Sequence, residues 1–257
     1  MKRRHSWLSS ALTAALLAGA AASSAAAEGA ADRKVVVELF TSQGCSSCPS
    51  ADRLLSELGS DGWRGIQVIP LSFHVDYWNY IGWTDPFSAA AWSERQRRYA
   101  TSFSSDRVYT PQLIVDGQSE CVGAYRREVG RHIENAARRA AEGEIELRLD
   151  GGAAGSTLVV SAALLPAAPT GANLLAAVFE TGLETAVGRG ENARRTLRND
   201  HVVRRLISLA QLTPGQRLRI EHRLELDPGW RREHLGVAVF LQSPETLEIY
   251  GAEAVDF

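Results

Sequence analysis

The residues of this sequence best suited to chemistry are two cysteines, Cys45 and Cys48, which form a C-x-x-C motif. With two residues between them, the second sulfur can reach the first, so the pair can alternate between dithiol and disulfide. Cys45 stands just before a predicted helix, whose N-terminal N–H groups stabilise a thiolate. We therefore expect Cys45 to be the more exposed thiol and the nucleophile that attacks a partner, and Cys48 to resolve the mixed disulfide.

Two other interpretations of the pair stay open at this point. A permanent structural disulfide between Cys45 and Cys48 would be inert, and the protein would then be a non-catalytic binding module. Alternatively, the two thiolates and His74 would bind Cu(I), a soft ion that thiolates select, and the protein would handle copper. The redox interpretation requires neither a metal nor a cofactor.

His74 is the next candidate, because it lies at the carboxyl end of a second predicted strand. Ligands and reactive groups gather at that edge of an open α/β sheet, and the helix after the cysteines begins at the same edge. We expect His74 and the nearby Asp76 to lie close to Cys45, where an imidazole can move protons. The alternative is that both side chains only bind their own loop.

Pro111 completes the candidate site. It stands just before a predicted strand, and a proline cannot join a central ladder at its own position. This placement favours a cis Thr110–Pro111 bond, although an ordinary trans turn would also accommodate the proline. The predicted catalytic set is therefore Cys45, Cys48, His74 and Pro111.

Alternating strands and helices must position these residues within residues 33–142, and their predicted order is β-α-β-α-β-β-α. The predicted strands cover residues 34–40, 66–73, 113–115 and 120–122, and the helices cover 51–58, a segment that begins near 86, and 129–140. Gly59 is expected to end the first helix, and Asp85 with Pro86 to open the second as N-cap and first-turn proline.

From residue 143 onward the pattern changes to alternating apolar and polar residues between Pro and Gly breaks. This pattern predicts a second, mostly antiparallel and sandwich-like β region over residues 143–257. Its predicted strands cover 144–149, 157–165, 173–180, 217–226 and 235–241.

The sequence allows a structural prediction for three further segments. Residues 77–87 are rich in Trp and Tyr, and we expect them to fold over the cysteine edge as a partial lid. The alternative is that these rings only fill the gap between the sheet and the helix that begins near Pro86. Cys121 is expected to pack as a small buried hydrophobe rather than to act as a third thiol. Residues 188–195 lack the spacing of a phosphate-binding loop, and we interpret them as a solvated loop. The alternative is that Glu191 and the neighbouring arginines order the interface between the two predicted domains.

The N-terminus has the pattern of a secretory signal peptide over residues 1–27: basic residues, an apolar run, and an A-x-A sequence at 25–27. The apolar run is short for a span, so no membrane anchor is expected after the leader is removed. Export to the periplasm or the medium would place the cysteines in an oxidising compartment. The net charge of −2 gives no basic field for nucleic acid, so the expected partners are exported protein or small-molecule thiols and disulfides.

Several longer blocks of sequence carry a family resemblance. They cover residues 38–52, 74–86, 95–96, 109–112, 190–197 and 201–204. Together they resemble the secreted thioredoxin-like family catalogued as domain of unknown function 1223. The resemblance implies a thioredoxin-like α/β domain over 33–142, with a cis Pro111 against the cysteine pair, followed by a β-rich domain over 143–257. It implies no substrate, and Gly44 stands where general disulfide reductases carry Trp. We predict an exported protein resembling thiol:disulfide oxidoreductases.

Overall fold

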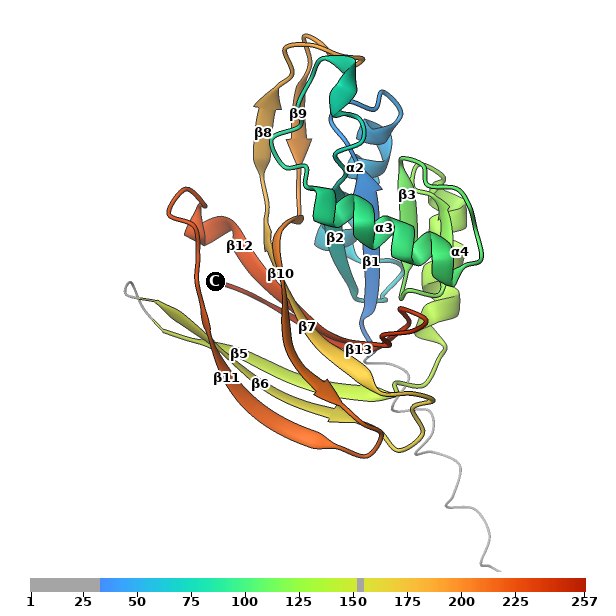
Figure 1. Cartoon of the computed structure of the whole chain (residues 1–257), viewed down its shortest axis with the longest axis vertical. Coiled ribbons are helices and arrows are strands. Elements are labelled where there is room, and N and C mark those ends of the chain that lie inside the picture. The colour runs from blue at the N-terminus through green and yellow to red at the C-terminus, as the bar shows by residue number, and fades with distance from the viewer. Residues whose placement is uncertain (1–32, 152–154) are drawn as a thin grey trace, which may run out of the picture.

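The computed structural model describes residues 33–151 and 155–257, so the predicted signal peptide lies outside the described residues. The largest element is a mixed sheet of eight strands in the order β13-β12-β7-β10-β2-β1-β3-β4 (Figure 1). Strands from both predicted regions join it, because β10 pairs with β2 in parallel at Val202 and Ser72. The sheet is therefore continuous across residue 142, and the division into two domains stays a prediction.

The first part of the chain follows the predicted order β-α-β-α-β-β-α. Its elements are β1 (Val35–Thr41), α2 (Cys48–Asp61), β2 (Val68–His74), the 3-10 helix η1 (Asn79–Ile81), α3 (Ala90–Ser102), β3 (Gln112–Val115), β4 (Ser119–Val122) and α4 (Arg126–Ala137). β1 is buried along its whole length, as its continuous apolar run predicts. It is parallel to β2 and antiparallel to β3, and its register places Thr41 beside His74 at the carboxyl ends of β1 and β2.

Two predicted helix boundaries are wrong. α2 continues through Gly59 and ends before Gly62, whose φ is 64°. Gly59 is instead required by packing, because a Cβ atom there would lie 2.2 Å from Nε2 of His201. α3 begins at Ala90 and not at Pro86, since the Asp85 carboxylate binds His74 instead of capping this helix.

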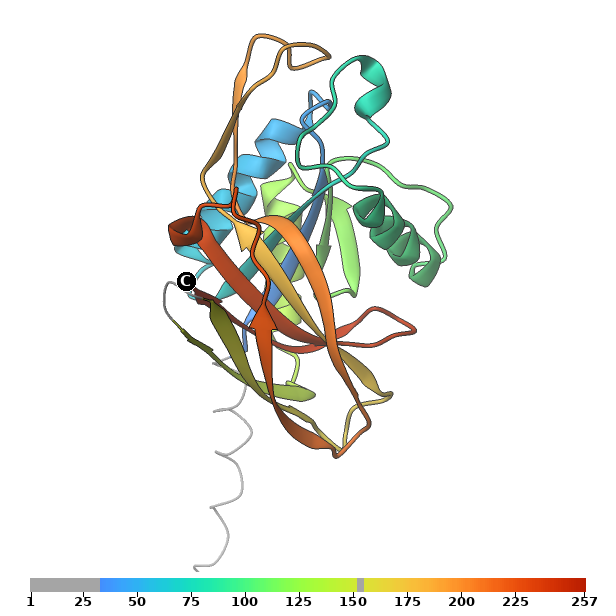
Figure 2. The ribbon, with the colours of Figure 1, turned by 60° about the vertical axis from the view of Figure 1, so that its left-hand side comes forward.

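The rest of the chain is mostly antiparallel β structure, as predicted. A three-stranded sheet consists of β5 (Gly143–Asp150), β6 (Ser156–Leu164) and β11 (Arg217–Leu224), while β7 (Ala172–Glu180), β10 (Val202–Leu212), β12 (Leu235–Gln242) and β13 (Ile249–Asp256) extend the large sheet. The two sheets pack against each other, and their facing side chains form one apolar cluster that includes Leu158 and Val239. A hairpin of β8 (Leu183–Ala186) and β9 (Thr196–Asn199) continues from β7 and β10 beyond the sheet (Figure 2). The 3-10 helix η2 (Arg232–His234) precedes β12.

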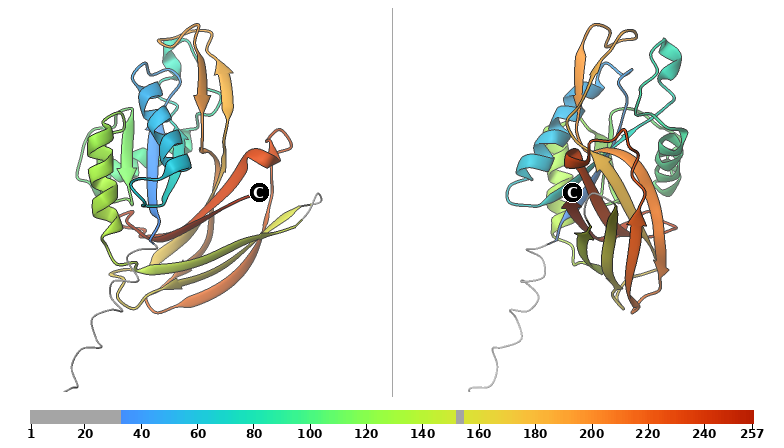
Figure 3. Two further views of the ribbon diagram at one scale, coloured as in Figure 1. Left: turned by 180° about the vertical axis from the view of Figure 1, so that it is seen from behind. Right: turned by 90° about the vertical axis from the view of Figure 1, so that its left-hand side faces the viewer.

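Helices cover both faces of the α/β part of the sheet (Figure 3). On one face, α2 and α4 place Leu55 and Ile133 in a buried cluster with Val37 of β1. On the other face, α3 places Trp92 and Tyr99 in a cluster that also contains side chains of β2 and β12. Among the residues that the structure describes, no helix is long and apolar enough to cross a membrane.

A buried ion pair connects α3 to the centre of the sheet. Arg95 Nε and Nη2 donate to the Glu38 carboxylate at 2.6 and 2.9 Å, and both residues are at least 96% buried. Tyr99 also donates to Glu38, and Arg95 Nη1 donates to Gln242 Oε1 at 3.1 Å. Because Gln242 is the last residue of β12, this cluster also joins α3 to the β-rich region.

We expect Glu38→Gln to lower the free energy of unfolding by about 3–5 kcal/mol, because it leaves the buried Arg95 charge without its counter-charge. Urea unfolding at neutral pH measures the change. The matched control is Glu94→Gln, which breaks the exposed pair between Glu94 and Arg97 on the same helix. This control is expected to cost less than about 1 kcal/mol. Equal losses in the two variants would contradict the importance of the buried pair.

Candidate functional site

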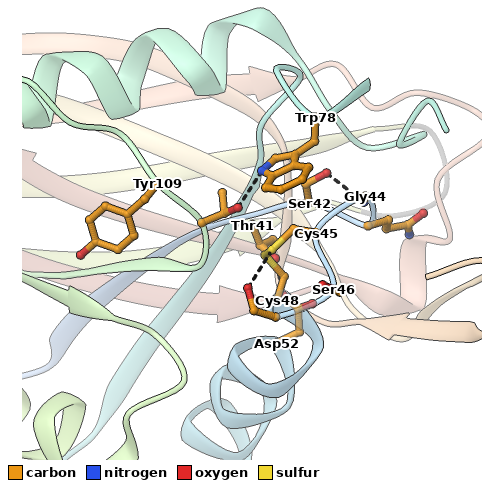
Figure 4. The surroundings of a disulfide bond; sticks show 12 residues. Thr41, Ser42, Gly44, Cys45, Ser46, Cys48, Asp52, Trp78 and Tyr109 are labelled. Atoms are coloured by element: carbon orange, nitrogen blue, oxygen red, sulfur yellow. Dashed lines mark hydrogen bonds between the residues drawn. A yellow bond between two sulfur atoms is a disulfide. The ribbon is translucent and has the colours of Figure 1, made fainter. Parts of the chain in front are cut away.

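Cys45 and Cys48 form a disulfide where the loop after β1 meets the start of α2 (Figure 4). The helix has Ser47 at its N-cap and Cys48 as its first residue. Cys45 Sγ lies 3.3 Å from Ser47 Oγ. We expected Cys45 to be more exposed than Cys48, but in the disulfide form both are buried, at 1% and 0% exposure. A partner therefore reaches the Cys45 sulfur only after the residues that cover it move.

Pro111 lies on the neighbouring loop, directly before β3. The Thr110–Pro111 peptide bond is cis, as expected, and Pro111 is buried. Trp78 Nε1 donates to Thr110 Oγ1 at 2.7 Å, which joins this loop to the aromatic segment. Trp78 and Tyr109 both lie around the disulfide (Figure 4). The expected catalytic role of Pro111 stays a prediction.

His74 lies at the end of β2, and its partner is Asp85, not Asp76. His74 Nδ1 lies 2.7 Å from Asp85 Oδ2, and both side chains are fully buried. Asp76 instead accepts a hydrogen bond from Ser93 on α3, and its expected place near Cys45 stays a prediction. His74 Nε2 is buried and has no hydrogen-bond partner among the residues that the structure describes.

Asp52 is a site residue that the sequence analysis missed. It lies on α2 one helical turn after Cys48, and side chains at this spacing lie on the same face of a helix. Asp52 is only 8% exposed, and its Oδ1 accepts a hydrogen bond from Thr41 Oγ1 at 2.8 Å. Figure 4 places it next to Cys48. A buried carboxyl group therefore lies beside the second cysteine.

The buried groups influence one another's ionisation. Burial raises the pKa of Asp52 to about 6, although the neighbouring His74 and the Thr41 hydrogen bond partly oppose this increase. Burial disfavours the charged form of His74, but the adjacent Asp85 carboxylate outweighs that effect and raises the pKa of His74 above its ordinary value. Burial also disfavours the Asp85 anion, yet His74 and backbone N–H donors hold the pKa of Asp85 below its usual range. The site thus combines an ion pair with a carboxyl group that titrates near neutrality.

The tip of the β8–β9 hairpin contacts the cysteine loop through Glu191 and Asn192, so residues 188–195 are not only a solvated loop, although most of their side chains are exposed. Asn192 is fully buried, and its Nδ2 donates to the carbonyl oxygens of Gln43 and Cys45, both at 2.9 Å. The Ser46 N–H donates to Glu191 Oε2 at 2.9 Å. No local pattern in the sequence predicts this contact.

The aromatic segment over residues 77–87 contacts the same loop. Tyr77 and Trp78 also pack against the apolar cluster between the sheet and α3, so the partial lid stays a prediction. Trp83 Nε1 donates to the Gln43 side chain at 3.3 Å. A Cβ atom at Gly44 would lie 3.1 Å from Ile81 Cδ1 and 3.2 Å from Trp78 Cβ. The close approach of this segment therefore explains why a small residue precedes Cys45 in place of a Trp. Tyr80, at 82% exposure, is the most exposed large apolar residue that the structure describes.

Cys121 is a free, buried cysteine on β4, in the apolar cluster beneath α4. Burial, together with the nearby carboxylates of Glu128 and Glu120, raises its pKa to about 12. The expectation that Cys121 packs as a small hydrophobe is confirmed.

Within residues 33–151 and 155–257, no three His, Cys, Asp or Glu residues are grouped so that they could hold a metal ion. The copper interpretation concerns the reduced thiolates of Cys45 and Cys48 together with His74, whereas the cysteines form a disulfide here, so it stays an untested alternative.

The raised pKa of Asp52 predicts that the free energy of unfolding depends on pH. Its pKa is higher in the folded chain, at about 6, than in the unfolded chain, near 4. Its ionisation therefore lowers the free energy of unfolding as the pH rises between these values. We expect Asp52→Asn to remove this loss and to be more stable than the wild type at pH 7, by at most roughly 3 kcal/mol.

Urea unfolding of the oxidised protein across this pH range measures the effect, and the gain should vanish near pH 3. Asp61→Asn is the control, because Asp61 is exposed at the end of the same helix. A stability difference that is independent of pH would contradict a raised pKa at Asp52.

Comparisons with known proteins agree with this architecture. A crystal structure of a protein from Agrobacterium tumefaciens, solved by a structural-genomics consortium, is 27% identical, with a TM-score of 0.70 over 86% of this chain and 93% of that chain. HBP35 of Porphyromonas gingivalis is 17% identical, with a TM-score of 0.61 over 88% of this chain and 75% of that chain, and it shows similarity of fold alone. No curated protein matches the chain. The model of the family described as "Protein of unknown function (DUF1223)" matches residues 36–242, and the chain therefore belongs to this family.

Proposed function

We propose that this protein is an exported thiol:disulfide oxidoreductase in which Cys45 and Cys48 are the redox pair. The observation that carries the proposal is the buried Asp52 carboxyl group next to Cys48, with a pKa of about 6. Burying such a group is costly, and an inert disulfide has no use for it. A resolving thiol does have a use for it, because it must lose a proton before it can attack.

The arrangement of the elements supports a thioredoxin-like unit over residues 33–142. The strand order β2-β1-β3-β4 places the cysteines at the carboxyl end of β1, between a parallel and an antiparallel neighbour. Pro111 precedes β3, the antiparallel neighbour of the strand that leads to the cysteines. We infer that a partner peptide would lie along this loop, beside Trp78 and Tyr109.

The proposed reduction of a partner disulfide proceeds in two steps. The Cys45 thiolate attacks one sulfur of the partner, a mixed disulfide forms, and the other partner sulfur leaves as a thiolate. Cys48 then transfers its proton to Asp52 and attacks Cys45 Sγ, which releases the second partner sulfur and closes the Cys45–Cys48 disulfide. Two electrons move from the protein to the partner. The reverse sequence oxidises a partner dithiol.

Asp52 is proposed as the proton acceptor and His74 as a positioning residue. The His74–Asp85 pair carries opposite charges inside the protein, and the positive imidazolium favours the ionised form of Asp52. In this way the carboxyl group keeps a pKa of about 6 despite its burial, which suits a base that works near neutral pH. The predicted leader supports a periplasmic or secreted location, where exported protein or small-molecule thiols and disulfides are the proposed partners.

We expect Cys48→Ser to accumulate mixed disulfides on Cys45, because the thiol that resolves them is missing. Incubation of the reduced variant with a disulfide-containing peptide, followed by mass spectrometry, measures the adduct. Cys45→Ser should form no adduct at position 48, whereas Cys121→Ser should behave like the wild type, since Cys121 is buried and forms no disulfide. If Cys45→Ser forms as much adduct on Cys48 as Cys48→Ser forms on Cys45, the roles of the two cysteines are assigned wrongly.

We also expect Asp52→Asn to slow the resolution step by about a hundredfold at pH 7, because the Cys48 proton loses its acceptor. The measurement is the rate at which a preformed mixed disulfide on Cys45 releases its thiol. The defect should shrink at high pH, where the Cys48 thiol ionises without help. Asp61→Asn is again the control, and a normal rate in Asp52→Asn would exclude Asp52 as the proton acceptor.

A further inference from the structure

The β-rich region contributes an acidic side chain to the cysteine motif. The tip of the β8–β9 hairpin is held in place by Asn192, which binds the backbone carbonyls of Gln43 and Cys45. Arg195 supports Asn192 by donating to its Oδ1 at 2.6 Å. The residue before Asn192, Glu191, accepts the N–H of Ser46 at 2.9 Å. A carboxylate is thereby fixed on the backbone between the two cysteines.

The Ser46 N–H has a particular importance at this position. Ser46 directly follows Cys45 and lies two residues before the first residue of α2, the helix whose N-terminal N–H groups carry the partial positive charge that stabilises a thiolate on the first cysteine of such a motif. Glu191 occupies this donor and adds a negative charge close to Cys45. The Ser47 hydroxyl, 3.3 Å from Cys45 Sγ, is left as a donor toward the sulfur.

We propose that Glu191 disfavours the thiolate of Cys45 and so biases the pair toward the disulfide, which makes the protein a reductant of its partners rather than an oxidant. This inference rests on the proposed function. A C-x-x-C motif whose reduced form is stabilised is a strong oxidant. Glu191 destabilises the reduced form, so it makes the pair more reducing. In the full cycle, the dithiol passes two electrons and two protons to a partner disulfide. An exported dithiol reductant must then return two electrons and two protons to the Cys45–Cys48 disulfide.

Other charged groups also face the pair, from the elements packed around it. Asp52 on α2, His74 on β2 and Asp85 after η1 are all buried beneath it, whereas Glu191 is exposed on the hairpin. The hydrogen bonds from Ser46 hold the pKa of Glu191 below its ordinary value, so its negative charge persists at neutral pH. Because Glu191 is exposed, its charge can be removed without opening a cavity.

The test measures the acidity of Cys45 in the full chain with Cys48→Ser, with and without Glu191→Gln. The pH dependence of iodoacetamide alkylation gives the thiolate fraction, and we expect Glu191→Gln to raise this fraction at pH 6 about two- to fivefold, as for other single charges at a helix end. With both cysteines present, the equilibrium constant for disulfide formation against glutathione should fall by a similar factor. Glu184→Gln, which removes an exposed carboxylate from β8 of the same hairpin, should change neither quantity.

Asn192→Ala provides a second, independent variant. If Asn192 positions Glu191, this substitution should reproduce the increase in thiolate fraction, and the double variant should show no further increase. An unchanged alkylation profile in Glu191→Gln would overturn the inference while leaving the exchange activity of the wild type intact. Absence of exchange activity in the wild type would instead overturn the proposed function, so the two failures are distinguishable.

Discussion

The Asp85 carboxylate joins three segments of the α/β part of the chain. It accepts the backbone N–H of Gln43 at 2.8 Å, the ring nitrogen of His74 at 2.7 Å, and the N–H of Phe87 at 2.9 Å. These donors belong to the cysteine loop, to the end of β2 and to the aromatic segment. A buried carboxylate is tolerated only when it is paired and hydrogen-bonded. The three segments therefore keep fixed positions relative to one another. The charged groups near the disulfide, Asp85 and His74, keep fixed positions as well.

The β-rich region is part of this site and not only an attachment to it. Asn192 satisfies two buried carbonyl groups of the cysteine loop from 147 and 149 residues further along the chain. Asn199 accepts a hydrogen bond from the Gln43 side chain at 3.0 Å. If the α/β part stood alone, these buried polar groups would lose their partners, which costs about 1–3 kcal/mol each. The hairpin thus stabilises the loop whose acidity it is proposed to control.

The sequence allowed the local features to be predicted and left the long-range ones hidden. The C-x-x-C motif and the strands of the α/β part follow from short periodic patterns. Asp85 stands before a proline and so resembles a helix N-cap, and only its tertiary contact with His74 shows otherwise. β10 was missed because two register shifts in its pairing with β7 interrupt the alternation of apolar and polar residues.

Asp52 could have been found from its spacing, because it stands one helical turn after Cys48 next to the apolar stripe of α2. Its burial depends on the packing of the loop above it, which no local pattern reveals. No pattern in the sequence identified Asn192 as a site residue, since its partners are backbone carbonyls far away in the sequence. Composition and spacing therefore predicted the reactive pair but not the groups that control it.

The reduction potential of the Cys45–Cys48 pair tests most directly whether this disulfide is chemically active. Equilibration of the full chain with buffers of known thiol-to-disulfide ratio, followed by trapping with an alkylating agent, gives this value. A working pair is expected to have a potential above about −300 mV, whereas a structural disulfide usually lies below it. A value below that limit, with a Cys45 thiol that fails to react with disulfides after reduction, would contradict a redox function.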